Sequence, residues 1–144
     1  MPLNRQIGGK ATFTEDGSFT VPLGVTEIYI TAIAAGGNGY IDYDGYSGEF
    51  VFRKKFNVNA GDSLAVTVGS GNTVVGTILT LLKAGNIPSN GVINSHGILG
   101  IGGSDCGYHS NGIYTAGFPG YGAGGGRGTQ IHGSGAPGVV VIEW

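Results

Sequence analysis

Apolar and polar residues alternate along much of the first 82 positions, which is the pattern of strands with one buried face. The strongest example is residues 26–35, where both alternating faces are largely apolar, so this segment is predicted to be a central strand. One face carries Ile28, Ile30, Ala32 and Ala34, and the other carries Tyr29, Thr31 and Ile33. Residues 139–144, with the sequence VVVIEW, form a second strong strand pattern at the C-terminal end of the chain.

Three further segments, residues 50–58, 63–68 and 73–82, also read as strands. Residues 63–68 place Leu64, Val66 and Val68 in one inward row. In residues 50–58, the predicted apolar face consists of Phe50, Phe52, Phe56 and Val58. Lys54 interrupts this face, which indicates either a strand edge where the side chain reaches solvent or a β-bulge.

Near the start of the chain, Asp16-Gly17 lies between two alternating segments, residues 12–14 and 18–21. An Asp-Gly pair in this setting is the strongest short-range signal for a β-hairpin. Pro22 then ends the second segment, because proline cannot donate to a strand ladder.

The chain contains about seven strand-like segments and no segment with a helical period. Turn signals separate them at intervals of about 8–12 residues, as in sandwiches and small barrels. The sequence therefore predicts an all-β fold: a sandwich or small-barrel-like sheet with a long glycine-rich loop region and a C-terminal closing strand. Residues 11–144 are predicted to form a single domain, preceded by a flexible or docking lead of residues 1–10.

The glycine-rich region comprises residues 97–138, which contain 16 glycines in 42 positions. Each glycine inside a helix or strand costs about 0.5–1 kcal/mol relative to alanine, so ordinary elements are disfavoured here. We interpret the region as compact glycine-walled turns that present aromatic and imidazole side chains; the alternative is a disordered low-complexity tract. The side chains that a flexible Gly-Ser linker would not need are Tyr108, His109, Tyr114, Phe118, Tyr121 and His132.

Charge and cysteine content exclude several classes of protein. Seven Lys and Arg residues and a net charge of −2 argue against nucleic acid as a partner, because a phosphate backbone requires clustered positive charge. Arg53-Lys54-Lys55 is the one basic cluster, and a strand with solvated charges explains it equally well. The single cysteine, Cys106, excludes an intramolecular disulfide framework and a cysteine-rich metal site.

No targeting or membrane segment is evident. The first residues lack the apolar core of a signal peptide, and no run approaches the roughly 20 apolar residues of a transmembrane helix. We therefore expect a protein made in a cytoplasm, without membrane insertion, that reaches the outside through cell lysis, assembly or a dedicated route.

The motifs that usually indicate cofactors or metals are incomplete. Residues 120–125 satisfy G-x-G-x-x-G but lack the preceding strand and following helix of a dinucleotide site. Asp42-Tyr43-Asp44-Gly45 resembles the start of a calcium loop, but the remaining acidic ligands are missing. The three histidines have no paired spacing for zinc. No nucleophile motif is present, so we expect no catalytic residues, no metal, no cofactor and no enzymatic activity.

Three stretches taken in order resemble a known family. Residues 19–32 (FTVPLGVTEIYITA) are similar to the entry strand of glycine-rich domains in bacteriophage tail-fibre and related receptor-binding proteins. Residues 56–69 (FNVNAGDSLAVTVG) resemble the central strand pair of that family, and residues 135–144 (GAPGVVVIEW) resemble its closing strand. Here the glycine run after the entry strand, residues 36–39, is short, so discrete glycine loops are expected.

The resemblance implies an adhesin domain of a virion, released by lysis, in contact with other virion or tail proteins. Its aromatic loop residues would bind a host surface glycan or outer-surface protein. The alternative is a structural fibre or decoration subunit with no receptor of its own. A homotrimer is expected from the resemblance, and also because the two-sided apolar segment at residues 28–34 leaves apolar surface that one small subunit does not cover.

Overall fold

The computed structural model describes residues 8–39, 45–84, 107–108, 114–115, 121–122 and 134–144. These residues form strands and connecting segments without a helix, which confirms the all-β prediction. The strands are β1 (Lys10–Phe13), β2 (Gly17–Thr20), β3 (Glu27–Ile33), β4 (Phe50–Asn57), β5 (Ser63–Thr67), β6 (Thr73–Val75), β7 (Leu79–Leu81), β8 (Gly107–Tyr108), β9 (Tyr114–Thr115) and β10 (Val139–Glu143).

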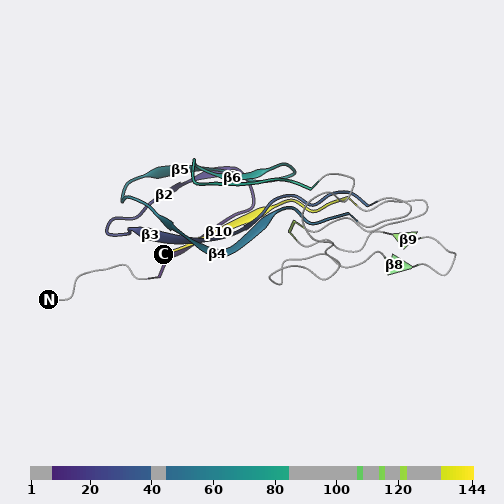
Figure 1. The fold of residues 1–144 in the computed structure, drawn as a ribbon, viewed down its shortest axis with the longest axis horizontal. Coiled ribbons are helices and arrows are strands. Elements are labelled where there is room, and N and C mark those ends of the chain that lie inside the picture. The colour runs from purple at the N-terminus through teal and green to yellow at the C-terminus, as the bar shows by residue number, and fades with distance from the viewer. Residues whose placement is uncertain (1–7, 40–44, 85–106, 109–113, 116–120, 123–133) are drawn as a thin grey trace.

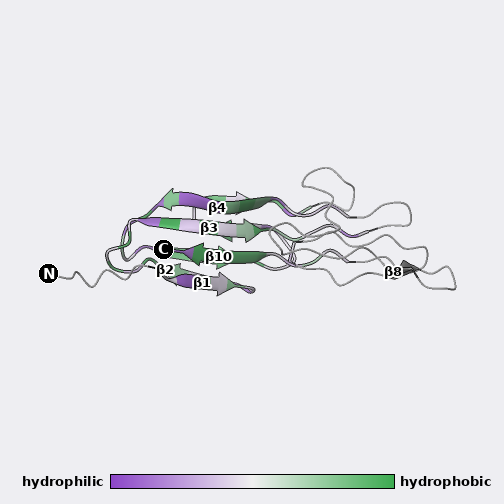
Figure 2. Cartoon of the chain, turned by 90° about the horizontal axis from the view of Figure 1, so that it is seen from below, coloured by the Kyte–Doolittle hydropathy of each residue, from purple (hydrophilic) through white to green (hydrophobic). Residues whose placement is uncertain are grey.

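Two antiparallel four-stranded sheets pack face to face as a sandwich, which is not closed into a barrel (Figure 1). One sheet has the order β1-β10-β3-β4 and the other β2-β5-β6-β7. Figure 2 shows the first sheet face-on, with β10 between β1 and β3. The C-terminal strand therefore closes the sheet as predicted, and β3 is a central strand as predicted.

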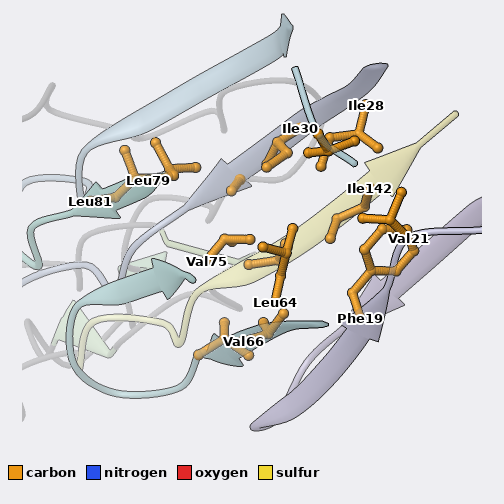
Figure 3. Packing of buried hydrophobic residues seen from close by; sticks show 14 of the residues in the cluster. Phe19, Val21, Ile28, Ile30, Leu64, Val66, Val75, Leu79, Leu81 and Ile142 are labelled. Carbon is orange, nitrogen blue, oxygen red and sulfur yellow. The ribbon is translucent and has the colours of Figure 1, made fainter. Parts of the chain in front are cut away.

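The core lies between the two sheets, where the alternating residues of β3 meet those of β5, β6 and β7 (Figure 3). Ile28 and Ile30 are fully buried there, and Leu64 and Val66 face them from the second sheet, in the inward row predicted for residues 63–68. Burial of each such side chain contributes about 1.5–3 kcal/mol relative to leaving it exposed.

The predicted hairpin at Asp16-Gly17 is wrong. β1 pairs with β10, and β2 pairs with β5 in the other sheet, so the chain crosses between the two layers at residues 14–16. The Asp16 carboxylate instead accepts a hydrogen bond from the backbone N–H of Val68 at 2.9 Å. This hydrogen bond links the segment that crosses between the two sheets to the residue after β5, and the turn does not join two paired strands.

Both interpretations of Lys54 are confirmed: it is exposed on β4, at the edge of its sheet, and β4 contains a β-bulge. Ile30 pairs with Lys54 and Ala32 with Val51, so Thr31 faces two residues of β4, Phe52 and Arg53. Arg53 has a φ of 46°, and its backbone N–H donates to Thr31 Oγ1 at 3.1 Å. The extra residue changes which face of the sheet the following side chains occupy.

The bulge also corrects the predicted shared face of four apolar residues in residues 50–58. Phe56 packs partly buried against the core and Val58 is buried, as predicted. Phe50 lies before the bulge and Phe52 is its first residue, and the two are 37% and 63% exposed. They share a face with each other by alternation, but that face is the outer one, because Phe50 pairs with Ile33 rather than with a residue of the core cluster.

Candidate binding face

Segments that follow or precede the sandwich strands converge beyond one end of the molecule, which we call the glycine end. It contains residues 34–39 after β3, residues 45–49 before β4 and residues 134–138 before β10. β8 and β9 also lie toward this end, whereas the C-terminus lies at the opposite end of the sandwich (Figures 1 and 2). The fold therefore separates an end that bears the C-terminus from an end that bears glycine-rich segments.

Backbone hydrogen bonds at the glycine end change direction from one residue to the next. The N–H groups of residues 34, 35 and 36 donate to three different neighbouring segments. The N–H of residue 37 then donates to the same segment, residues 45–49, as that of residue 34. A three-residue repeat is that of a polyproline II helix, whereas a strand repeats every two residues. The bonds are Ala34 N to Glu49 O (2.9 Å), Ala35 N to Gly71 O (3.3 Å), Gly36 N to Ala136 O (2.9 Å) and Gly37 N to Tyr46 O (2.9 Å).

Glycine is required where these segments pass each other. A Cβ on Gly45 would overlap the carbonyl oxygen of Gly37, and a Cβ on Gly135 would overlap that of Gly36. Gly48 faces the Ala34 carbonyl in the same way. Because these obstacles are backbone atoms, a larger residue cannot be accommodated by rotating a side chain. The described part of the glycine end is therefore a tightly packed, hydrogen-bonded bundle of extended chains.

Tyr121 is the predicted site residue whose side chain the structure describes, and it is 39% exposed. The next residue, Gly122, fixes its position: Gly122 N donates to Pro137 O at 2.6 Å, and Gly48 N donates to Gly122 O at 3.1 Å. Gly122 has a φ of 66° and lies against Ile33 on the outer face of the sheet, where an added Cβ would overlap that side chain. The exposed side chain of Tyr121 therefore directly precedes a glycine that two backbone hydrogen bonds hold in place.

Tyr108 and Tyr114 are brought opposite each other in the short β8–β9 ladder, in which Gly107 pairs with Thr115 and Tyr108 with Tyr114. The structure thus brings together two predicted site residues that are six positions apart in the sequence. The other three predicted site residues, His109, Phe118 and His132, lie outside the described residues, as do the acids of the Asp42-Tyr43-Asp44 motif.

Sequence reasoning missed the exposed apolar residues Phe50, Phe52 and Leu82, of which Leu82 is 46% exposed. The alternation of Phe50 and Phe52 with Phe56 placed them on the buried face, because a bulge is invisible to a two-residue period. The signal that could have found them was Lys54, which breaks that period.

Titratable groups in the described residues form surface pairs rather than a reactive cluster. Arg53 Nη1 lies 3.3 Å from Glu143 Oε2, and Lys55 Nζ lies 3.2 Å from Glu27 Oε1, with all four side chains substantially exposed. No group of three or more His, Cys, Asp or Glu side chains able to hold a metal ion occurs in that part of the chain. The same residues contain no helix long and apolar enough to span a membrane.

Comparison of the chain with protein-family models, with curated proteins and with solved structures found no match. The functional argument therefore rests on the geometry of this chain.

Proposed function

We propose that the protein is a non-enzymatic, phage-type adhesin that binds a host cell surface through aromatic side chains at the glycine end. The observation that carries the proposal is an exposed aromatic residue, Tyr121, next to Gly122, which is hydrogen-bonded into the glycine-end bundle. Tyrosine offers flat apolar area and a hydroxyl group at low rotamer cost, which suits both sugar rings and protein surfaces.

Rigidity favours binding because an ordered loop loses less conformational entropy when it meets its partner. Hydrogen bonds from Ala34, Gly36 and Gly37 tie the segments of the glycine end together before any partner arrives. A shallow face that relies on stacking gives weak single sites, so several copies on one particle would supply the avidity. We accordingly propose the virion as the setting, with release by lysis and contact with other tail proteins.

The second candidate function is a structural subunit of a particle that uses the same face against its neighbours. It accounts for the tight glycine packing equally well, and it predicts that Tyr121 contacts a neighbouring subunit rather than a receptor. A host glycan and an outer-surface protein both remain as receptors within the adhesin proposal.

The homotrimer stays a prediction, but its contact surface must lie elsewhere than on β3. Ile28, Ile30 and Ile33 on the two faces of β3 are each 0–1% exposed within one chain. The apolar residues that motivated an oligomer are therefore already covered by the chain itself.

The experiment compares the wild type with a variant that carries Tyr108→Ser, Tyr114→Ser and Tyr121→Ser, using fluorescently labelled protein and a panel of bacterial strains. A matched control is Leu23→Ser, which removes an apolar side chain that is 92% exposed in the turn between β2 and β3, away from the glycine end. Lost cell binding with unchanged mass and fold supports the adhesin. Lost assembly supports the structural subunit, and unchanged binding and assembly would show that these tyrosines are not the site.

A further inference from the structure

Exposed apolar side chains gather around one short stretch of β4. Of the five large hydrophobic residues that are exposed in the described part of the chain, Phe50 and Phe52 belong to β4 itself. Leu82 is joined to Glu49 by two hydrogen bonds, Glu49 N to Leu82 O at 3.0 Å and Leu82 N to Glu49 Oε2 at 2.7 Å. We call Phe50, Phe52 and Leu82 the β4 patch.

The β4 patch lies at the edge of the first sheet. Among the described strands β4 stands at the edge of its sheet, with β3 as its neighbour. β4 begins with Phe50, Val51 and Phe52 and continues with Arg53, Lys54 and Lys55, and Figure 2 shows the corresponding change from hydrophobic to hydrophilic colour along this part of the strand. Proteins usually protect edge strands with charges or bulges; in β4 the bulge lies at residues 52 and 53 and the charges begin at Arg53, so Phe50 and Val51 precede both.

The sequence around the patch reads Glu49-Phe50-Val51-Phe52-Arg53. When this sequence is placed antiparallel to a second copy of itself, apolar residues lie opposite apolar residues and the acidic end lies opposite the basic end. If two copies meet with antiparallel β4 strands about a two-fold axis near Val51, Phe50 of one copy comes opposite Phe52 of the other. The acidic end at Glu49 then meets the basic end at Arg53. Two-fold interfaces require this kind of self-complementary patch, and facing aromatic pairs and opposite charges both stabilise it.

A second copy explains the patch better than a sugar does. The side chains of Phe50, Phe52 and Leu82 offer no hydrogen-bonding atoms. Sugars need several directional hydrogen bonds from their site, whereas a facing apolar patch needs none. Glu49 accepts a bond from Leu82 N and Arg53 pairs with Glu143 within the chain, and a carboxylate and a guanidinium each retain capacity for a further partner.

We propose that two copies of the chain associate through their β4 patches, with antiparallel β4 strands, to form a two-fold symmetric dimer. This goes beyond receptor binding, and it makes the assembly two-fold rather than the trimer expected from the sequence. The dimer leaves Leu23 and the C-terminal end of each sandwich free.

The first test measures mass against concentration by analytical ultracentrifugation of the intact chain. The wild type is expected to approach twice 14.5 kDa, and Phe50→Ser with Phe52→Ser to weaken association roughly tenfold or more. Leu23→Ser, which removes a more exposed side chain, is expected to change nothing. A wild-type mass that stays at 14.5 kDa, a mass three times that value, or equal weakening by Leu23→Ser would overturn the proposal.

The second test uses charge reversal. Glu49→Arg alone and Arg53→Glu alone each place like charges opposite one another, so each variant is expected to be monomeric by itself. Mixed in equal amounts, they restore opposite charges at both ends and are expected to form a heterodimer. Circular dichroism and thermal unfolding establish that each variant is folded. Folded variants that self-associate as well as they cross-associate would contradict the antiparallel arrangement.

Discussion

Gly9, which precedes β1, and Trp144, which follows β10, are joined by two backbone hydrogen bonds. Gly9 N donates to Trp144 O at 2.9 Å, and Trp144 N donates to Gly9 O at 3.1 Å. The pair extends the β1–β10 ladder by one step, and it places the indole ring 5.3 Å from the ring of Phe19 in the core. Trp144 therefore links the closing strand, the entry to β1 and the second sheet.

Gly9→Ala is expected to destabilise the protein by about 1–3 kcal/mol, as for other overpacked sites. A Cβ at this position would overlap the indole of Trp144, which is itself held against Phe19. Urea unfolding followed by circular dichroism measures the change. Lys10→Ala, which removes an exposed side chain on the adjacent residue, is the control and is expected to stay within about 0.5 kcal/mol of the wild type.

Gly135→Ala tests the packing of the glycine end. The new Cβ would overlap the Gly36 carbonyl, so the segment carrying Ala136 must move away and weaken the bond from Gly36 N to Ala136 O. A loss of about 1–3 kcal/mol is expected. Gly71→Ala is the matched control, because nothing lies within 4 Å of its added Cβ. Equal stability of the two variants would show that the close packing at Gly135 contributes nothing.

Thr31→Val tests the bulge. The buried Thr31 hydroxyl accepts the backbone N–H of Arg53 at 3.1 Å, and valine keeps the shape of the side chain but removes this acceptor. The free energy of unfolding is expected to fall by about 1 kcal/mol. Thr12→Val, on an exposed position of β1, controls for the change of side-chain type. If both substitutions have the same effect, the hydroxyl does not hold the bulge.

The sequence predicted the elements of this fold that depend on alternation within one strand. Residues 26–35 and 139–144 were identified as strands because their periods are uninterrupted, and the core side of β3 follows from the same period. The hairpin prediction failed because the Asp-Gly signal is local, whereas β1 finds its partner in β10, about 130 residues later. β1 pairs with β10 because of packing between residues that are far apart in the sequence, and a short stretch of sequence does not reveal it.

The candidate site was predictable in part. Tyr108, Tyr114 and Tyr121 stood out because aromatic residues are unexpected among glycines, and the structure pairs the first two and exposes the third. The bundle that holds Gly122 could not be predicted, because Gly122 accepts a hydrogen bond from Gly48 N and donates one to Pro137 O, and both residues are distant in the sequence or hidden among glycines. Phe50 and Phe52 were assigned to the wrong face because a single extra residue in β4 inverts the alternation.

The account depends most on the claim that the glycine end, rather than the opposite end, meets the partner. Blocking each end in turn tests it directly. In a Cys106→Ser background, a single cysteine is introduced as Ser134→Cys, at an exposed position of the glycine end, or as Leu23→Cys, coupled to biotin and capped with monovalent streptavidin.

Binding of each capped protein to bacterial cells is then measured against the same uncapped variant. Because streptavidin is larger than this 14.5 kDa chain, it covers the end to which it is attached. The account predicts that the cap at position 134 abolishes binding and that the cap at position 23 leaves it unchanged. Binding that survives the cap at position 134, or that is lost only with the cap at position 23, would contradict it.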